Sequence, residues 1–425
     1  MAKVVRRRWE SDQQSGLARR DRQSCDYDVY IPDRVVGRAI ALDGPVAADV
    51  AEAEMAVAKL NMKARALSDS EALARLLLRS ESVASSKIEG LEIGARRLLK
   101  AEAARTLGEE SSDVTAGDIL GNIDAMVHAL ESVTEGDTIT VDLLLEAHRR
   151  LLAGSRLEKH GGRLRTQQNW IGGSSFNPCA AAYVPPPWEL VEEYVSDLVD
   201  FCNENSLPAV AQAAVAHAQF ETIHPFIDGN GRTGRVLIHM VLRRRGLVPR
   251  VLPPVSLVLA TWATDYVGAL ISTRYIGSAD SVEAHEGLNR WIGLFAAACR
   301  RAVADAAAFE ERVALLEQSW RKQLGRVRAN SALDLLLRAL PGAPLFTVQS
   351  AAALIDRSVP AANGAVARLV EAKLLSQLSV GKRNRAFEAP QLIRAFADLE
   401  RQLASPTGDT RVTLPNRRVP RRAQP

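Results

Sequence analysis

Aromatic residues, cysteines and long apolar runs are all scarce in this chain. Only 5% of its 425 residues are Phe, Trp or Tyr, so its core must be built mainly from aliphatic side chains, which suits helix packing. The four cysteines lie far apart and form no CxxC pair, which indicates neither a structural zinc site nor a disulfide framework. No apolar run has the length of a membrane span, and residues 1–22 lack the apolar part of a secretory signal. These absences predict a protein of the reducing cytoplasm that does not associate with a membrane.

Charge of one sign is also not in large excess. The formal net charge is +4, and much of the basic excess lies at the two ends, in Arg6–Arg8 and in residues 417–422. Such runs are usually solvated, and we interpret both ends as disordered. The length predicts two or three domains.

One stretch, residues 224–235, carries an unusual concentration of side chains that can do chemistry. The Ala-rich residues 210–223 before it predict a buried helix, which Pro225 is expected to end. A tight Gly-Asn-Gly turn follows at 229–231, and residues 233–245 predict a second helix. The sequence therefore predicts a helix, a glycine turn and a second helix in direct succession.

The side chains of this stretch suit the handling of phosphate. Amides at a glycine-rich turn and a helix start bind anions, and Arg232 and Arg235 are three apart, so both face the same side. Asp228 beside the turn is a candidate ligand for Mg²⁺. His224 lies outside the helices and titrates near neutrality, as a general base should.

The order His-Pro-Phe-x-Asp-Gly-Asn-Gly-Arg-x-x-Arg resembles the signature of Fic-domain proteins at every position. Most members of that family transfer AMP from ATP to a hydroxyl side chain of a target protein. The resemblance implies that His224 deprotonates this hydroxyl, that Phe226 anchors the loop, and that Asp228 coordinates Mg²⁺. It implies ATP-binding roles for five residues, namely Gly229, Asn230 and Gly231 at the α- and β-phosphates, Arg232 at the leaving pyrophosphate and Arg235 at the γ-phosphate. By the same resemblance the catalytic residues are His224, Asn230 and Arg232.

A second segment, Ser85-Ser-Lys-Ile-Glu-Gly90, resembles the inhibitory helix motif of the same family. Ser85 and Glu89 are four apart and would share one helix face. The resemblance implies that Glu89 pairs with Arg235 and displaces the γ-phosphate, because one guanidinium cannot serve a carboxylate and a triphosphate together. An ordinary exposed helical Glu is the alternative. The position of the motif, N-terminal to the signature, resembles the class in which inhibition is intramolecular.

A third segment, residues 163–187, predicts a β-hairpin flap. Two β-capable runs, 168–171 and 182–184, flank a stretch rich in Gly, Ser, Asn and Pro. In the family this flap holds the backbone of the target beside the catalytic His by strand addition. The flap residues implied are Asn169, Trp170, Ile171, Tyr183 and Val184. The alternatives are a plain surface hairpin and, for Trp170, simple packing.

The last folded piece, residues 328–400, has a different pattern. Helices are predicted at 331–340, 347–355 and 359–372, and β-capable runs at 374–378 and 385–388 flank a basic turn, 381–384. This order resembles bacterial winged-helix domains, in which the second helix of the pair enters DNA and the wing contacts phosphates. The middle of the second helix, 359–372, is Ala-rich, so its recognition of bases would be weak. DNA binding and a protein-docking or dimerisation role are therefore both open for this domain.

The predicted fold is mainly α: a Fic-type helical bundle with a small β-hairpin flap, followed by a winged helix-turn-helix domain. The expected parts are an N-terminal helical segment with the inhibitory helix (1–110), the Fic catalytic core (111–325), the winged-helix domain (328–400) and a basic disordered tail (401–425). Three helices are expected between 37 and 130, at 46–67, 70–86 and 116–131, and one at 141–152.

Three functions fit these features. The first is a Mg²⁺-dependent protein adenylyltransferase that modifies Ser, Thr or Tyr hydroxyls of a target, and also itself, under inhibition by Glu89. The second is a Fic-fold enzyme that uses another nucleotide donor or removes AMP. The third is an ATP-sensing regulator that binds DNA through the winged helix. The expected partners are ATP and a target protein, and the resemblance also allows a homodimer.

Overall fold

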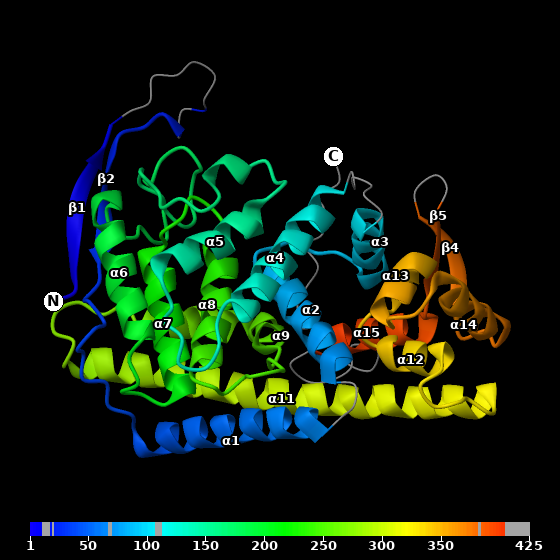
Figure 1. Ribbon diagram of the computed structural model, residues 1–425. Helices are drawn as coiled ribbons and strands as arrows, with labels where there is room; N and C mark the ends of the chain where they lie inside the picture. Colours follow the sequence, from blue (N-terminus) through cyan, green and yellow to red (C-terminus); the bar gives the residue numbers. More distant parts are fainter. Residues whose placement is uncertain (11–17, 19–20, 67–69, 107–112, 381–383, 404–425) are drawn as a thin grey trace, which may run out of the picture. The chain divides into compact units, whose positions relative to one another are not determined.

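The computed structural model describes residues 1–10, 18, 21–66, 70–106, 113–380 and 384–403, and it is mainly helical (Figure 1). The α-helices are α1 (Gly44–Ala66), α2 (Ser70–Ile88), α3 (Ala95–Thr106), α4 (Val114–Glu131), α5 (Val141–Leu152), α6 (Val191–Cys202), α7 (Ala209–Ile223), α8 (Asn230–Arg244), α9 (Val255–Thr261), α10 (Ala263–Ser272), α11 (Val282–Leu324), α12 (Ala332–Ala339), α13 (Val348–Leu354), α14 (Val359–Glu371) and α15 (Pro390–Leu403). Short 3₁₀ helices lie at η2 (Glu158–His160) and η3 (Trp188–Leu190). The strands are β1 (Lys3–Trp9), β2 (Cys25–Ile31), β3 (Leu345–Thr347), β4 (Ser376–Val380) and β5 (Asn384–Glu388).

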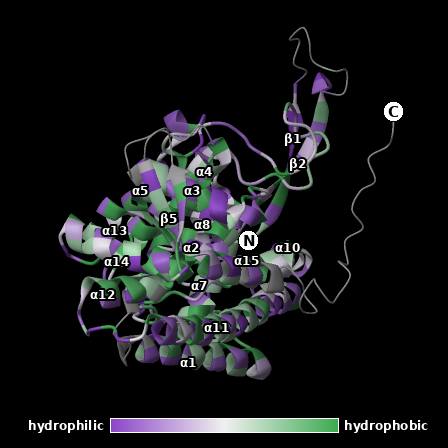
Figure 2. Cartoon of the chain, turned by 90° about the vertical axis from the view of Figure 1, so that its right-hand side faces the viewer, coloured by the Kyte–Doolittle hydropathy of each residue, from purple (hydrophilic) through white to green (hydrophobic). Residues whose placement is uncertain are grey.

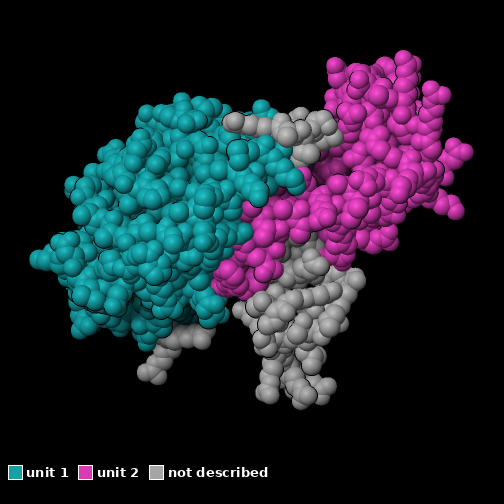
Figure 3. Space-filling model, turned by 90° about the horizontal axis from the view of Figure 1, so that it is seen from below, with its two compact units in different colours: residues 1–63, 121–252, 264–300 teal, residues 64–120, 253–263, 301–425 magenta. Residues whose placement is uncertain are grey.

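The chain forms two compact units whose segments alternate along the sequence (Figure 3). The first unit comprises residues 1–63, 121–252 and 264–300, and the second comprises residues 64–120, 253–263 and 301–425. The candidate signature and the flap belong to the first unit, whereas α2 and the C-terminal elements belong to the second.

The first unit is built around α7 and α8, which lie side by side (Figure 1). All of α7 except Glu221 is buried, since small Ala side chains let neighbouring helices approach it from every side. Helix α6 packs on α7, and α5 packs on α8. Helix α5 begins at Thr140, whose side chain accepts a hydrogen bond from the Leu143 N–H, so the predicted start of this helix is confirmed.

The helices of the sequence analysis are found, with small shifts of their ends. Helix α8 begins at Asn230, three residues before the predicted start, because Gly229 with φ 77° serves as its N-cap. Helix α3 was not predicted, so residues 37–131 contain four helices among the described residues instead of three. Figure 2 shows hydrophilic and hydrophobic residues mixed along α1 and α11, as on helices with one buried face.

The N-terminal segment contradicts its prediction. Arg6–Arg8 belong to β1, which pairs antiparallel with β2 from Lys3 opposite Ile31 to Trp9 opposite Cys25. Across this two-stranded ribbon, Arg6 forms an ion pair with Asp28, and Arg8 forms one with Asp26. The predicted disorder of this basic run is therefore wrong. The basic run at 417–422 lies outside the described residues.

The expectation that no disulfide forms is also wrong. Cys25 at the start of β2 and Cys179 in the loop of the flap are joined by a disulfide bond, although they lie 154 positions apart in the sequence. Cys202 and Cys299 are buried. Sequence spacing could not show this pairing, because only the folded ribbon brings β2 to the flap.

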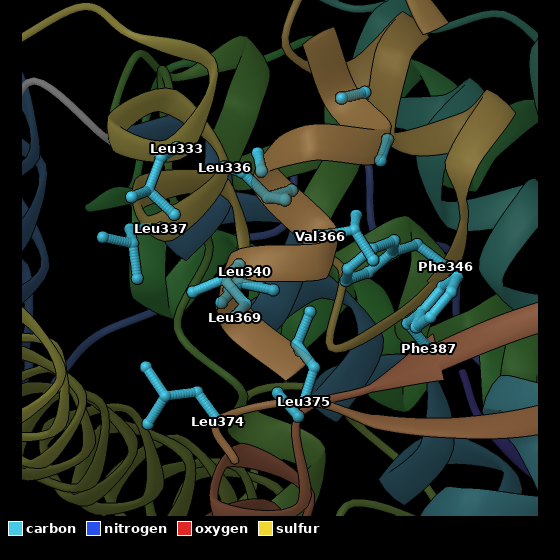
Figure 4. Packing of buried hydrophobic residues seen from close by; sticks show 14 of the residues in the cluster. Leu333, Leu336, Leu337, Leu340, Phe346, Val366, Leu369, Leu374, Leu375 and Phe387 are labelled. Atoms are coloured by element: carbon cyan, nitrogen blue, oxygen red, sulfur yellow. The ribbon is translucent and has the colours of Figure 1, made fainter. Parts of the chain in front are cut away.

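The second unit has its own apolar core, formed by α12, α13, α14, the small sheet and the C-terminal part of α11 (Figure 4). Leu336, Leu337, Val366, Leu369 and Phe387 are among its buried side chains. The sheet has the order β3-β5-β4, and the helices and the β4–β5 hairpin lie close to where the sequence predicts them. Strand β3 and helix α15 are additions. The tip of the hairpin, with Lys382 and Arg383, lies outside the described residues, and the winged-helix assignment stays a prediction.

Within the described part of the chain, no single helix has both the length and the apolar composition needed to cross a membrane. Only the bent pair of α9 and α10 meets that test, on length and composition alone.

Candidate active site

The turn from α7 to α8 forms the candidate site, and His224 occupies its first position. The residue is the C-cap of α7 in a left-handed conformation, with φ 49° and ψ 62°, and its N–H donates to the Phe220 carbonyl at 2.9 Å. This conformation costs a non-glycine residue on the order of 1–2 kcal/mol, so the surrounding contacts must hold it. It turns the chain out of α7 and leaves His224 half-buried between the two helices.

Gly234 allows α7 and α8 to approach each other behind this turn. A Cβ atom at this position would lie 2.8 Å from Glu221 Oε1, 2.9 Å from Phe220 Cδ1 and 3.1 Å from His217 Nδ1. Any larger residue would push the helices apart and move the His224 turn relative to the start of α8.

Asn230 braces the turn from inside. Its side-chain oxygen accepts from the Phe226 N–H, and its amide nitrogen donates to the Phe226 carbonyl, both at 2.8 Å. The ring of Phe226 is fully buried, as the anchoring role predicts. Because the Asn230 amide is used in this way, phosphate binding by Asn230 would rest on its backbone N–H at the start of α8.

His148, on α5, supports the turn from below, and the sequence analysis missed it. Its ring stacks on Phe226 with centroids 3.7 Å apart, Nε2 lies 3.0 Å from the Asp228 carbonyl, and Nδ1 lies 3.1 Å from the Gly162 N–H. These partners require a neutral ring, because Nδ1 must accept from Gly162 while Nε2 donates to Asp228. The pKa of His148 is lowered to about 4, chiefly by burial; the hydrogen bond and charge of Asp228 oppose this shift, and the charge of Arg232 adds to it.

The charged side chains of the signature lie on and before the first turns of α8. The Asp228 carboxylate is 53% exposed, and its Oδ2 atom lies 3.7 Å from an Arg232 guanidinium nitrogen. Arg232 and Arg235 are both buried. Two buried guanidinium groups beside the uncapped N–H groups of a helix start favour a polyanionic ligand at this position.

Arg235 is connected to an aromatic cluster in the core of the unit. Its Nη1 atom lies 3.4 Å from the Tyr266 hydroxyl, which in turn lies 2.7 Å from His217 Nε2. Tyr266 packs against Trp291, with ring centroids 5.7 Å apart. Burial and then the charge of Arg235 lower the pKa of His217 to about 3, so this ring is neutral beside the guanidinium.

The flap is less regular than a hairpin. Ile171 and Tyr183 form a single antiparallel bridge, with the Ile171 N–H donating to the Tyr183 carbonyl at 2.8 Å. Longer strands are prevented by Gly172 and Gly173, which have positive φ, and by the proline run 185–187.

The five predicted flap residues have different surroundings. Ile171 is 38% exposed, whereas Val184 is buried and its carbonyl accepts from the Tyr30 N–H of β2 at 3.0 Å. Trp170 packs edge-on against Trp9 of β1, with ring centroids 5.5 Å apart. The Tyr183 hydroxyl donates to the Thr222 carbonyl of α7 at 2.7 Å, and burial raises its pKa.

Asn169 faces the turn between α7 and α8, since its amide nitrogen lies 2.9 Å from the Phe226 carbonyl and 3.3 Å from the His224 carbonyl. Arg165, a second residue that the sequence analysis missed, is buried beside it and donates to the His224 carbonyl at 3.0 Å. Burial lowers the pKa of this guanidinium to about 10, so it is charged at neutral pH. The sequence contains no signal of this role, because the flap was predicted from its β-capable runs and turn residues and Arg165 belongs to neither.

The predicted inhibitory residues belong to the second unit. Ser85 is buried within α2, and Glu89 is exposed in the turn that follows Ile88, the last residue of that helix. The Glu89 N–H donates to the Ser86 carbonyl at 3.1 Å, and Gly90 with φ 82° completes the turn. Glu89 therefore lies one residue beyond the helix on which the sequence placed it.

Comparisons with known proteins agree with this arrangement. Residues 138–242 match the family model described as "Fic/DOC family", and residues 47–131 match the model described as "Fic/DOC family N-terminal". The chain is 38% identical over 122 residues to protein adenylyltransferase fic-1 of Caenorhabditis elegans, which covers 28% of this chain and 22% of that protein. It is 37% identical over 139 residues to protein adenylyltransferase Fic of Drosophila willistoni, which covers 32% of this chain and 26% of that protein.

The match thus spans about a quarter of the length of these curated relatives. Among solved structures, a Fic family protein from Desulfovibrio desulfuricans G20 has a TM-score of 0.51 and 21% identity, over 82% of this chain and 97% of that chain. This likeness shows the fold.

Proposed function

We propose that this chain is a Fic-family protein that transfers AMP from ATP to a hydroxyl side chain of a target protein, itself included. The observation that carries the proposal is the turn between α7 and α8. It holds His224 at one end and the N–H groups of α8 with buried Arg232 and Arg235 at the other. The named relatives, protein adenylyltransferases, support the same reaction.

The reaction follows from this arrangement. The target hydroxyl oxygen attacks the α-phosphorus of ATP, the bond to the β-phosphate breaks, and pyrophosphate leaves. His224 accepts the hydroxyl proton. Arg232 and Arg235 neutralise charge that develops on the leaving pyrophosphate, and the first N–H groups of α8 hold the phosphate chain. Positioning and electrostatics supply most of the rate enhancement in such transfers.

Asp228 fits the magnesium ion that the proposal includes. Mg²⁺ in nucleotide sites is usually held by one or two carboxylates together with substrate phosphates and water, and the Asp228 carboxylate is exposed beside the phosphate-binding turn. The described residues contain no cluster of three His, Cys, Asp or Glu that could hold a metal without the nucleotide. The ion would neutralise phosphate charge when bound, and Asp228 would orient it.

We further propose that Glu89 inhibits the reaction by competing with the γ-phosphate for Arg235. Support comes from the motif Ser85 to Gly90 and from the burial of Arg235, a guanidinium that a carboxylate and a phosphate cannot occupy together. A carboxylate on this guanidinium would shift the γ-phosphate, and a displacement of about 1 Å can cost on the order of 100-fold in rate.

Labelling with ATP that carries ³²P at the α-phosphate tests both proposals. We expect weak self-labelling of the wild type, strong labelling of Glu89→Gly and none of His224→Ala. His285→Ala is the matched control, because His285 is a half-buried histidine of the same unit, paired with Asp43, and its labelling should equal that of the wild type. Equal labelling of Glu89→Gly and wild type would contradict the inhibition. Labelling of His224→Ala would contradict the assigned base.

The same assay separates the alternatives. Label from GTP or UTP in preference to ATP would identify another donor, and release of AMP from a labelled protein would identify the reverse activity. A gel shift of promoter DNA that His224→Ala leaves unchanged, without any transfer, would favour the regulator.

A further inference from the structure

Arg165 has an unusual set of hydrogen bonds for a buried guanidinium. All of its acceptors are backbone carbonyl oxygens: His224 at 3.0 Å, Gln167 at 3.2 Å, Ile223 at 3.4 Å and Pro186. Its own N–H donates to the Pro225 carbonyl at 2.9 Å. The side chain is only 2% exposed and is among the largest fully buried side chains of the protein.

These acceptors come from two parts of the site. Gln167 and Pro186 lie at the two ends of the flap, while Ile223 and His224 form the end of α7. One rigid fork therefore ties both legs of the flap to the catalytic turn. Lysine could not do this, because its ammonium is a single point of charge on a flexible stem.

The bond to His224 has a particular consequence. The left-handed conformation of this residue is strained, and its carbonyl accepts from both Arg165 and Asn169. Two donors fix the direction of the carbonyl, and with it the ψ angle and the position from which the imidazole extends. Asn169 also donates to the Phe226 carbonyl, so the flap is bonded to both sides of Pro225.

We propose that Arg165 is a positioning residue that sets the register between the flap and His224. A hydroxyl presented on the flap must come within hydrogen-bond reach of the His224 imidazole. The position of the flap and the position of the imidazole both depend on the Arg165 guanidinium. We expect ATP binding not to depend on it, because the hydrogen bonds of its guanidinium go to the flap and to the end of α7 and none goes to α8. The inference rests on the proposed transfer of AMP to a flap-bound hydroxyl.

The test compares Arg165→Lys and Arg165→Gln with Arg244→Gln. Arg244 is a matched control, because it is also buried and donates to the Asn203 and Glu204 carbonyls and to the Asn205 side chain, at the far end of α8. In the Glu89→Gly background, we expect Arg165→Gln and Arg165→Lys to lower the turnover number for self-labelling about 100-fold or more. Their KM for ATP and their ATP affinity by calorimetry should stay within about twofold of the parent, and Arg244→Gln should keep the parent turnover number while losing thermal stability.

Hydrogen exchange gives a readout that needs no activity. In Arg165→Gln, amides of residues 166–186 and 222–228 should exchange faster, while α5 and α6 keep their rates. A loss of ATP affinity in proportion to activity, or faster exchange throughout the unit as expected for Arg244→Gln, would overturn the proposal. So would full activity in Arg165→Lys. Absence of any His224-dependent label in the parent, with the exchange result as predicted, would instead reject the proposed reaction and leave Arg165 as the residue that joins the flap to the turn.

Discussion

At the scale of single residues, His148 connects the chemistry of the site to pH. Its ring is neutral in the folded protein because both nitrogens have fixed backbone partners and burial lowers its pKa to about 4. In the unfolded chain the pKa is near 6.5. Protonation therefore favours the unfolded state. The stabilising effect of the neutral His148 ring is complete above pH 6.5 and is lost as the pH falls from 6.5 towards 4.

We expect the free energy of unfolding to fall by on the order of 3 kcal/mol over this range on account of His148, with a further contribution from His217. Urea denaturation at several pH values measures this loss. His148→Asn should be less stable at pH 7 and should show a shallower decline towards pH 4. An unchanged slope in His148→Asn would show that this ring is not the group that titrates.

Gly234 offers a second test at the residue scale. Gly234→Ala places a methyl group within 3 Å of two side-chain atoms of α7, so overpacking should destabilise by about 1–3 kcal/mol despite the gain in helix propensity. Gly364 in α14 is the matched control, because a Cβ there meets nothing within 4 Å. Gly364→Ala should stabilise by about 0.4–1 kcal/mol. Urea denaturation of both variants measures the difference, and equal effects would contradict the close approach of α7 and α8.

At the scale of elements, the N-terminal ribbon is fixed to the flap by the Cys25–Cys179 disulfide. The bond closes a loop of about 150 residues in the chain, and such cross-links stabilise by about 4–5 kcal/mol when the unfolded chain is otherwise free. We expect Cys25→Ser with Cys179→Ser to lower the free energy of unfolding by up to this amount and to speed hydrogen exchange in β2. Reduction of the wild type with dithiothreitol should reproduce the effect, and a reductant effect that persists in the double variant would have another cause.

The elements that the sequence predicted share one property. A helix such as α5 forms from apolar residues three and four apart, a pattern that one short window of the sequence reveals. The β1–β2 ribbon and the disulfide depend on pairing between residues far apart in the chain, such as Lys3 with Ile31, and no local pattern encodes that pairing.

The residues of the site also fall into a group that the sequence predicted and a group that it did not. The signature from His224 to Arg235 lies in one continuous segment, so its residues could be predicted together. His148 and Arg165 act through backbone carbonyls and N–H groups that only the fold brings to them. Side-chain chemistry read from the sequence does not reveal such partners, since every residue has the same backbone groups.

At the scale of the whole molecule, the two units have separate apolar cores, and the proposed nucleotide site lies in the first. A ligand that binds only the folded form stabilises it by about 2.7 kcal/mol at a concentration 100 times its Kd. With ATP and Mg²⁺ at that concentration, we expect amides of the first unit that exchange through its unfolding to exchange up to about 100-fold more slowly, with the strongest protection at residues 224–235. Residues 332–375 of the second unit should change least, because their core holds none of the signature residues.

Arg235→Ala should abolish most of the protection, since it removes the guanidinium proposed to hold the γ-phosphate. His224→Ala should keep the protection, since a general base contributes to transfer and not to nucleotide binding. Hydrogen exchange with mass spectrometry on these three proteins would separate binding from chemistry across the molecule. Equal protection of both units in the wild type would mean that they unfold as one cooperative body, and protection that survives in Arg235→Ala would move the γ-phosphate to another residue.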